Sequence, residues 1–258
     1  MASIEAYLTI DDAPSGDTPR KLALLDALGI KALLFCRGEF IDQRPEIAAD
    51  IIKHGHVMGN HSYNHPYFSR MRLAKCKAQI ERTDRSIDQV YEKAGIERPA
   101  RVFRFPWGDK GTGTHLEEQA APDQVLHARA IQAFLVQLGY AQPAFPGVIY
   151  PSYPGWNLDT DADTWWTFDA MEWALLSKKV RDGIDSMEKV LDRIDKYFTA
   201  KLSEEASRSA PEIIVIHDFE ATANTFSPIL DRFIARGVKF GFPGMALGHA
   251  IKARVEKK

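Results

Sequence analysis

Short apolar runs that alternate with amphipathic stretches constrain the fold of this chain more than any other feature. Such alternation is typical of βα units in a parallel sheet. The run 213–216 consists of β-branched residues only, as expected for a strand buried on both faces. The pattern predicts strands at 7–10, 32–35, 57–59, 101–105, before 159, at 213–216 and at 238–242, and helices at 18–28, 45–54, 71–93, 124–138, 184–198 and from 227 onward.

The number of these units indicates the domain organisation. We find no sequence repeat and no low-complexity linker, so residues 1–258 are interpreted as one domain of about seven βα units. Closing a parallel sheet into a barrel leaves no exposed edge strand. The expected architecture is therefore an α/β barrel.

Composition excludes several classes of function. Lys and Arg number 33 against 35 Asp and Glu, a formal net charge of −2. Phosphate binding needs a basic excess, so this balance argues against a nucleic-acid or anionic-membrane surface. No run of about 18 apolar residues is present, so no membrane span is expected. The first residues lack the basic and apolar regions of a secretory signal peptide. This predicts a cytoplasmic protein, or an exported one if the printed sequence is a trimmed form. Two cysteines, Cys36 and Cys76, leave a single disulfide possible but not implied.

Polar residues follow several of the expected strands directly. Because the carboxyl ends of parallel strands meet at one rim, where ligands bind in α/β folds, we expect these side chains to gather there. The residues concerned are Asp11, Asp12, His61, His65, Arg104, Trp107, Asp159 and His217. His61 and His65 are four residues apart, so both imidazoles can reach one ion. With one aspartate they would form a triad suited to zinc or another divalent cation.

Each of these features also has a purely structural interpretation. An isolated pair of histidines is more often a solvated pair near a turn, and Asp11-Asp12 could cap the helix that begins near Thr18. Asp12 lies six positions before Thr18, which weakens the capping interpretation. Adjacent carboxylates at a strand end point in different directions, so one can bind a metal ion while the other acts as a base on water.

Four segments, in order along the chain, resemble the motifs of the NodB-type polysaccharide deacetylases, carbohydrate esterase family 4. Residues 9–13 (Thr-Ile-Asp-Asp-Ala) resemble the family's T-F-D-D-G motif, and residues 61–65 (His-Ser-Tyr-Asn-His) its H-S/T-x-x-H motif. Residues 104–107 (Arg-Phe-Pro-Trp) resemble R-x-P-aromatic, and residues 215–217 (Val-Ile-His) resemble L-x-H. The resemblance covers residues 7–242 and implies a distorted (β/α)7 barrel.

The resemblance also implies a role for each matching residue. Asp12, His61 and His65 would bind a divalent metal ion, most often zinc, with cobalt, manganese or nickel as alternatives. Asp11 would be the general base, oriented by Arg104, and His217 the general acid. The backbone N–H of Trp107 would stabilise the oxyanion. We assign substrate binding to Trp107, Pro106 and Trp165. An equally good interpretation of Trp165 and Trp166 is that they pack in the hydrophobic core.

The chain departs from the family pattern at the first of these motifs and at a fifth, D-x-x-D-W. Ala13 stands where the family has glycine, so its backbone must avoid left-handed angles. The D-x-x-D-W motif is assigned to the segment 159–166, with Asp159 as the hydrogen-bond partner of His217 and Asp161 as the alternative.

Three functions remain open from the sequence. The first is a metal-dependent hydrolase that removes acetyl groups, mostly N-acetyl, from a carbohydrate. The second is an amidase or deformylase of the same fold that acts on a small or lipid-linked amide. The third is a catalytically silent carbohydrate-binding barrel. The glycan and the oligomeric state are left open.

Overall fold

A parallel sheet forms the centre of the computed structural model, which describes residues 3–113, 118–153, 155–204 and 209–244. The hydrogen-bonded order is β3-β2-β1-β5-β4, and β6 pairs with the first residues of β1. All of these pairings are parallel. The strands are β1 (Ile4–Ala13), β2 (Ala32–Cys36), β3 (Val57–Asn60), β4 (Phe168–Asp169), β5 (Glu212–His217) and β6 (Val238–Gly241).

Two single-residue bridges continue the sheet beyond β3. Phe103 pairs in parallel with Asn60 on one side and with Asp163 on the other. The sheet thus has six parallel strands, extended beyond β3 by Phe103 and Asp163, and the fold agrees with the expected distorted (β/α)7 barrel.

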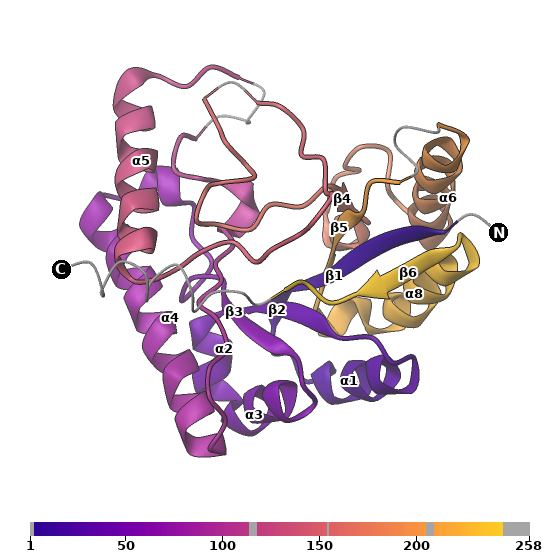
Figure 1. Cartoon of the computed structure of the whole chain (residues 1–258), viewed down its shortest axis with the longest axis horizontal. Helices are drawn as coiled ribbons and strands as arrows, with labels where there is room; N and C mark the ends of the chain where they lie inside the picture. The colour runs from indigo at the N-terminus through magenta and orange to yellow at the C-terminus, as the bar shows by residue number, and fades with distance from the viewer. Residues whose placement is uncertain (1–2, 114–117, 154, 205–208, 245–258) are drawn as a thin grey trace.

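Helices surround this sheet (Figure 1). They are α1 (Thr18–Ala27), α2 (Gly38–Gln43), α3 (Pro45–Lys53), α4 (Leu73–Ala94), α5 (Pro122–Gln137), α6 (Met187–Ser203) and α8 (Phe226–Ala235), with short 3-10 helices η1 (Phe68–Arg70), η2 (Pro106–Gly108), η3 (Glu172–Leu176) and η4 (Glu220–Thr225). In Figure 1, α1 to α4 lie beside β2 and β3, and α6 and α8 lie beside β5 and β6. Among the described residues, no helix is long and apolar enough to cross a membrane.

The core confirms most of the predicted apolar pattern. Every residue of 213–216 is buried, as expected for a strand covered on both faces. The stripe predicted over 184–198 also packs into the core, where Val190, Ile194 and Phe198 are completely buried. Cys36 and Cys76 are buried free thiols.

Two strand predictions were wrong. The segment 101–105 contributes only its bridge residue Phe103, because Pro106 starts η2 immediately afterwards. The strand expected before residue 159 lies in a turn, and the chain returns to the sheet later, at β4. A strand of two residues shows no periodicity, so the sequence pattern gave no sign of it.

Candidate functional site

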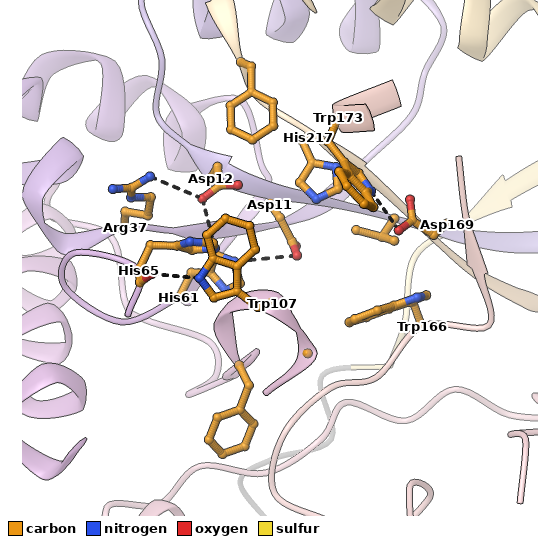
Figure 2. Close-up of a pocket in the computed structure, with 14 residues that line it drawn as sticks. Asp11, Asp12, Arg37, His61, His65, Trp107, Trp166, Asp169, Trp173 and His217 are labelled. Carbon is orange, nitrogen blue, oxygen red and sulfur yellow. Dashed lines mark hydrogen bonds and ion pairs between the residues drawn. The ribbon is translucent and has the colours of Figure 1, made fainter. Parts of the chain in front are cut away.

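A pocket of about 260 Å³ lies at the carboxyl ends of β1, β3 and β5 (Figure 2). Asp11, Asp12, His61, His65, Trp107 and His217 all line it, together with Arg37, Phe105, Gly108, Trp166, Asp169, Trp173, Val215 and Phe219. Strand pairing explains this convergence. Asp11 of β1 lies directly opposite His217 of β5, and the backbone N–H of His61 donates to the carbonyl of Cys36 at the end of β2 (2.9 Å).

Asp12, His61 and His65 form a group with the chemistry of a metal site. Each offers one ligand atom, and these atoms lie within 4.8 Å of one another. Asp12 Oδ1 lies 3.4 Å from His65 Nε2 and is buried without a hydrogen-bond partner. An unpaired buried carboxylate oxygen is costly unless a cation occupies the space beside it. Asp12 has a φ of 63°, and Ala13 is outside the left-handed region, as predicted.

Both imidazoles are held in the neutral form that metal binding needs. Burial lowers the pKa of His61 to about 3 and that of His65 to about 2. His61 Nδ1 lies 2.8 Å from the carbonyl oxygen of Arg104, so Nδ1 carries the proton and donates it there. The lone pair of His61 is therefore on Nε2, facing the pocket. Burial also raises the pKa of Asp12 to about 6. These three residues fit a divalent cation.

Asp11 is held by a buried arginine. Arg104 Nη1 donates to Asp11 Oδ1 (2.8 Å) and to Thr9 Oγ1 (2.7 Å). The guanidinium lies over the ring of Phe35, 4.3 Å from its centroid, and Arg104 is 1% exposed. The ion pair therefore fixes one oxygen of Asp11, while Oδ2 lies 3.7 Å from His61 Nε2.

His217 lies on the side of Asp11 away from His61 and His65 (Figure 2), and it is bound to Glu172. Its Nδ1 is 3.0 Å from Glu172 Oε1, which also accepts from the backbone N–H of His217 (2.5 Å). Burial alone lowers the pKa of His217, but the carboxylates of Glu172, Asp169 and Asp11 outweigh it and raise the pKa to about 10. His217 is therefore a cation at neutral pH. Asp169, Glu172 and His217 also converge within 4.8 Å, but the bond to Glu172 engages the imidazole as a donor rather than as a metal ligand.

The assignment of Asp159 was wrong. Asp159 lines a separate cavity beside Gln142 and Tyr150, away from His217. The alternative, Asp161, is paired with the buried Lys110 (2.8 Å). Two tryptophans after these aspartates made the segment look like the D-x-x-D-W motif.

The motif that sequence reasoning missed lies ten residues further on. Residues 169–173 read Asp-Ala-Met-Glu-Trp, which has the spacing of D-x-x-D-W with glutamate in place of the second aspartate. Asp169 accepts from the backbone N–H of Met171 (2.7 Å) and from Trp173 Nε1 (3.0 Å). Allowing glutamate at the fourth position would have identified the partner of His217.

The three predicted substrate-binding residues differ in their exposure and in whether they line the pocket. Trp107 lies at the pocket with 59% of its surface exposed, and its Nε1 donates to the carbonyl of His65 (3.1 Å). Trp165 is 8% exposed and stacks behind Trp166, which is the residue that lines the pocket. Pro106 is buried in η2 and is outside the pocket lining. Trp165 and Pro106 thus lie outside the pocket lining, and their assignment to substrate binding stays a prediction.

Comparison with known sequences identifies relatives of this chain. Residues 2–123 match the family model described as polysaccharide deacetylase. A peptidoglycan-N-acetylglucosamine deacetylase of Bacillus cereus is 34% identical over 106 residues, 41% of this chain and 37% of that protein. The putative polysaccharide deacetylase YheN of Bacillus subtilis is 23% identical over 248 residues, 93% of this chain and 67% of that protein. The chain thus spans little more than a third of the first relative.

Solved structures share the fold over nearly the whole chain. A family 4 carbohydrate esterase from Streptomyces lividans, solved with acetate, has a TM-score of 0.59 and 21% identity, covering 94% of both chains. A family 4 pseudoenzyme from Bacillus anthracis has a TM-score of 0.57 and 18% identity, covering 93% of this chain and 64% of that one. The first half of the chain thus matches the polysaccharide deacetylase family model, and the fold of the whole chain is that of the solved family 4 carbohydrate esterases.

Proposed function

We propose that this protein is a metal-dependent hydrolase that removes acetyl groups, mainly N-acetyl groups, from a carbohydrate. One observation carries the proposal: a metal-type triad, a carboxylate and a cationic imidazole line the same pocket. Hydrolysis of an amide needs a polarised carbonyl, an activated water and a proton for the leaving nitrogen. The pocket offers a candidate for each requirement.

Asp12, His61 and His65 are the proposed ligands of the metal ion. Zinc is the first candidate, since it favours nitrogen and carboxylate ligands and keeps an open position in catalytic sites; cobalt, manganese and nickel are alternatives. When bound, such an ion polarises the acyl oxygen and lowers the pKa of water.

Asp11 is the proposed general base. Arg104 holds its Oδ1, so the other carboxylate oxygen can take the proton from the attacking water. Figure 2 shows Asp11 between the histidine pair and His217, where it can contact a water placed against the acyl carbon. The backbone N–H of Trp107 is the proposed donor to the oxyanion that forms when water adds.

His217 is the proposed general acid. Because its Nδ1 proton is bound by Glu172, the proton on Nε2 is the one available to the leaving nitrogen. Transfer of this proton accompanies cleavage of the C–N bond, which releases acetate and a free amine. Glu172 stabilises the cationic imidazole before transfer, and Asp169 adds a second negative charge nearby.

The pocket volume favours one alternative function. About 260 Å³ is small for an extended glycan but sufficient for one sugar residue or a small amide, so an amidase or deformylase of this fold is the second candidate. A silent carbohydrate-binding barrel is the third, since a solved neighbour is described as a pseudoenzyme. The complete set of Asp11, Asp12, His61, His65 and His217 supports an active site instead.

Acetate release tests the proposal. Purified protein is loaded with zinc or cobalt and assayed on acetylated chito-oligosaccharides, acetylated xylan and N-acetylglucosamine, with and without a chelator. We expect chelator-sensitive release that is lost in His61→Ala together with the bound metal. His54→Ala, which changes a partly exposed histidine that is paired with Asp26 outside the pocket, is the matched control and should keep both. Metal retained in folded His61→Ala would refute the ligand assignment. Metal binding without release from any sugar would favour the small amides.

A further inference from the structure

Arg37 is a cationic side chain in the pocket that the proposed reaction does not use. Of the described residues that line the pocket, it is the one lysine or arginine. It follows β2 directly, and its side chain is 20% exposed. Figure 2 shows Arg37 on the side of Asp12 and His65, with Trp166 and Trp173 on the opposite side.

The backbone fixes Arg37 between the two segments that carry the proposed metal ligands. Its N–H donates to the carbonyl of Ala13 (2.9 Å), and the N–H of Gly38 donates to that of Ser62 (3.0 Å). The guanidinium also packs on Phe40, 4.2 Å from the centroid of its ring. A cation held in this way loses little conformational entropy when it binds a ligand.

The hydrogen-bonding capacity of this guanidinium is only partly used. Nη2 donates to Glu39, but Nε is buried without a partner. Nη1 lies 3.7 Å from Asp12 Oδ1, which is longer than a hydrogen bond. Nη1 therefore ion-pairs with Asp12 but makes no hydrogen bond among the described residues, and it is the donor of Arg37 that remains for an anionic group in the pocket.

From this arrangement we infer that the acetylated sugar carries an anionic group, a carboxylate or a phosphate, which Arg37 binds. The inference rests on the proposed function and specifies its substrate class. A sugar whose acetyl group lies at Asp12 shares the pocket with Arg37, whose Nη1 is 3.7 Å from Asp12 Oδ1, so an anionic substituent next to the acetyl group can reach the guanidinium. A neutral sugar would give Nη1 no charged acceptor.

Matched substrates test this inference. The panel is N-acetylglucosamine, its 1-phosphate, its 6-phosphate, its 6-carboxylate and its 3-O-lactyl ether, so that charge type and position both vary. We expect kcat/KM to be at least tenfold higher for one or more anionic members than for the neutral sugar. In Arg37→Gln this ratio should fall at least tenfold, and Arg37→Lys, which keeps a point charge, should lie between. The comparison of carboxylates with phosphates identifies the anion.

Arg44→Gln is the matched control. Arg44 lies over the same Phe40 ring (5.5 Å) but is outside the pocket lining, so its loss should leave the ratio unchanged. An equal ratio in wild type and Arg37→Gln would overturn the inference while acetate release would still support the hydrolase.

A binding measurement separates the two proposals if no sugar is hydrolysed. The deacetylated forms of the same sugars are titrated into wild type and Arg37→Gln by calorimetry. Anionic sugars that bind wild type at least tenfold more tightly than the variant would support the role of Arg37, even with the hydrolase refuted. Equal binding, or none, would overturn it.

Discussion

Glu172→Gln is the substitution that most directly tests how His217 works. Glu172 contacts both Nδ1 and the backbone N–H of His217. Glutamine has nearly the same shape and keeps an acceptor oxygen, but it removes the negative charge. The rise in the His217 pKa from 6.5 to about 10 corresponds to roughly 5 kcal/mol in favour of the cation. Glu172 is the largest of the contributions that raise this pKa.

Loss of that charge should bring the pKa of His217 down by about 2 or more, toward neutrality, since burial still opposes the cation. The acid is active only when protonated, so activity falls as pH rises through its pKa. In wild type that fall should occur near pH 10, and in Glu172→Gln near pH 7 to 8. At pH 9 the variant should therefore retain roughly a tenth of its own low-pH activity or less.

The assay is the pH dependence of kcat/KM, together with the titration of the His217 ring followed by NMR. Asp159→Asn is the control, because Asp159 lies in a different cavity and should leave both profiles unchanged. A high-pH limb at the same position in Glu172→Gln and wild type would refute the assignment of His217 as the acid controlled by Glu172.

Three further predictions concern other parts of the molecule. Asp12→Asn should weaken metal affinity at least tenfold, measured by competition with a chromophoric chelator, because the charged ligand is lost; unchanged affinity would contradict its role. Trp107→Ala should raise KM for the sugar with little change in Tm, because the ring is 59% exposed; an unchanged KM would remove it from the substrate site. Lys110→Met should lower Tm by roughly 10 °C without changing metal affinity, since it leaves the buried Asp163 and the partly buried Asp161 without their cation; a shift under about 2 °C would show that the ion pairs contribute little.

The site residues that sequence reasoning found share one property: nearly all follow an apolar run that forms a strand. Asp11 and Asp12 end β1, His61 follows β3, and His217 ends β5. Their assembly could be predicted because parallel strands bring their carboxyl ends to one rim. The roles assigned to them stay proposals, which the substitutions above test.

The residues that were missed or misplaced lack that signal. Glu172 follows a strand of two residues, which is too short to show a pattern. Trp165 and Trp166 are adjacent and equally apolar, and only packing decides that Trp166 lines the pocket while Trp165 stacks behind it. Asp161 lies near the position in sequence that was expected for the partner of His217. Its carboxylate pairs instead with Lys110, which lies 51 residues earlier in the chain. Such long-range pairing is not visible in local periodicity.

The two halves of the chain contribute different parts of the site. The proposed metal ligands and base all lie within residues 2–123, which match the family model, whereas Glu172 and His217 lie beyond that match. The halves meet where β1 pairs with β5, and a buried carboxylate holds them there. Asp218 donates its backbone N–H to the carbonyl of Asp11 (2.8 Å), and its carboxylate accepts from Ser15 Oγ (2.8 Å) and Lys21 Nζ (2.5 Å).

This division has a consequence for substrate choice. Of the residues that line the pocket, the aromatic Trp166, Trp173 and Phe219 belong to the second half, while Trp107 and Arg37 belong to the first. The reacting groups are fixed by strand ends and buried ion pairs, so changes in the second-half walls can alter the space for the sugar without moving the metal ligands. Substitution of Trp166 should therefore change substrate preference. Substitution of Asp12 should lower metal affinity and, with it, the activity on every substrate alike. If Trp166 variants lost metal as readily as Asp12 variants, the two halves would not be separable in this way.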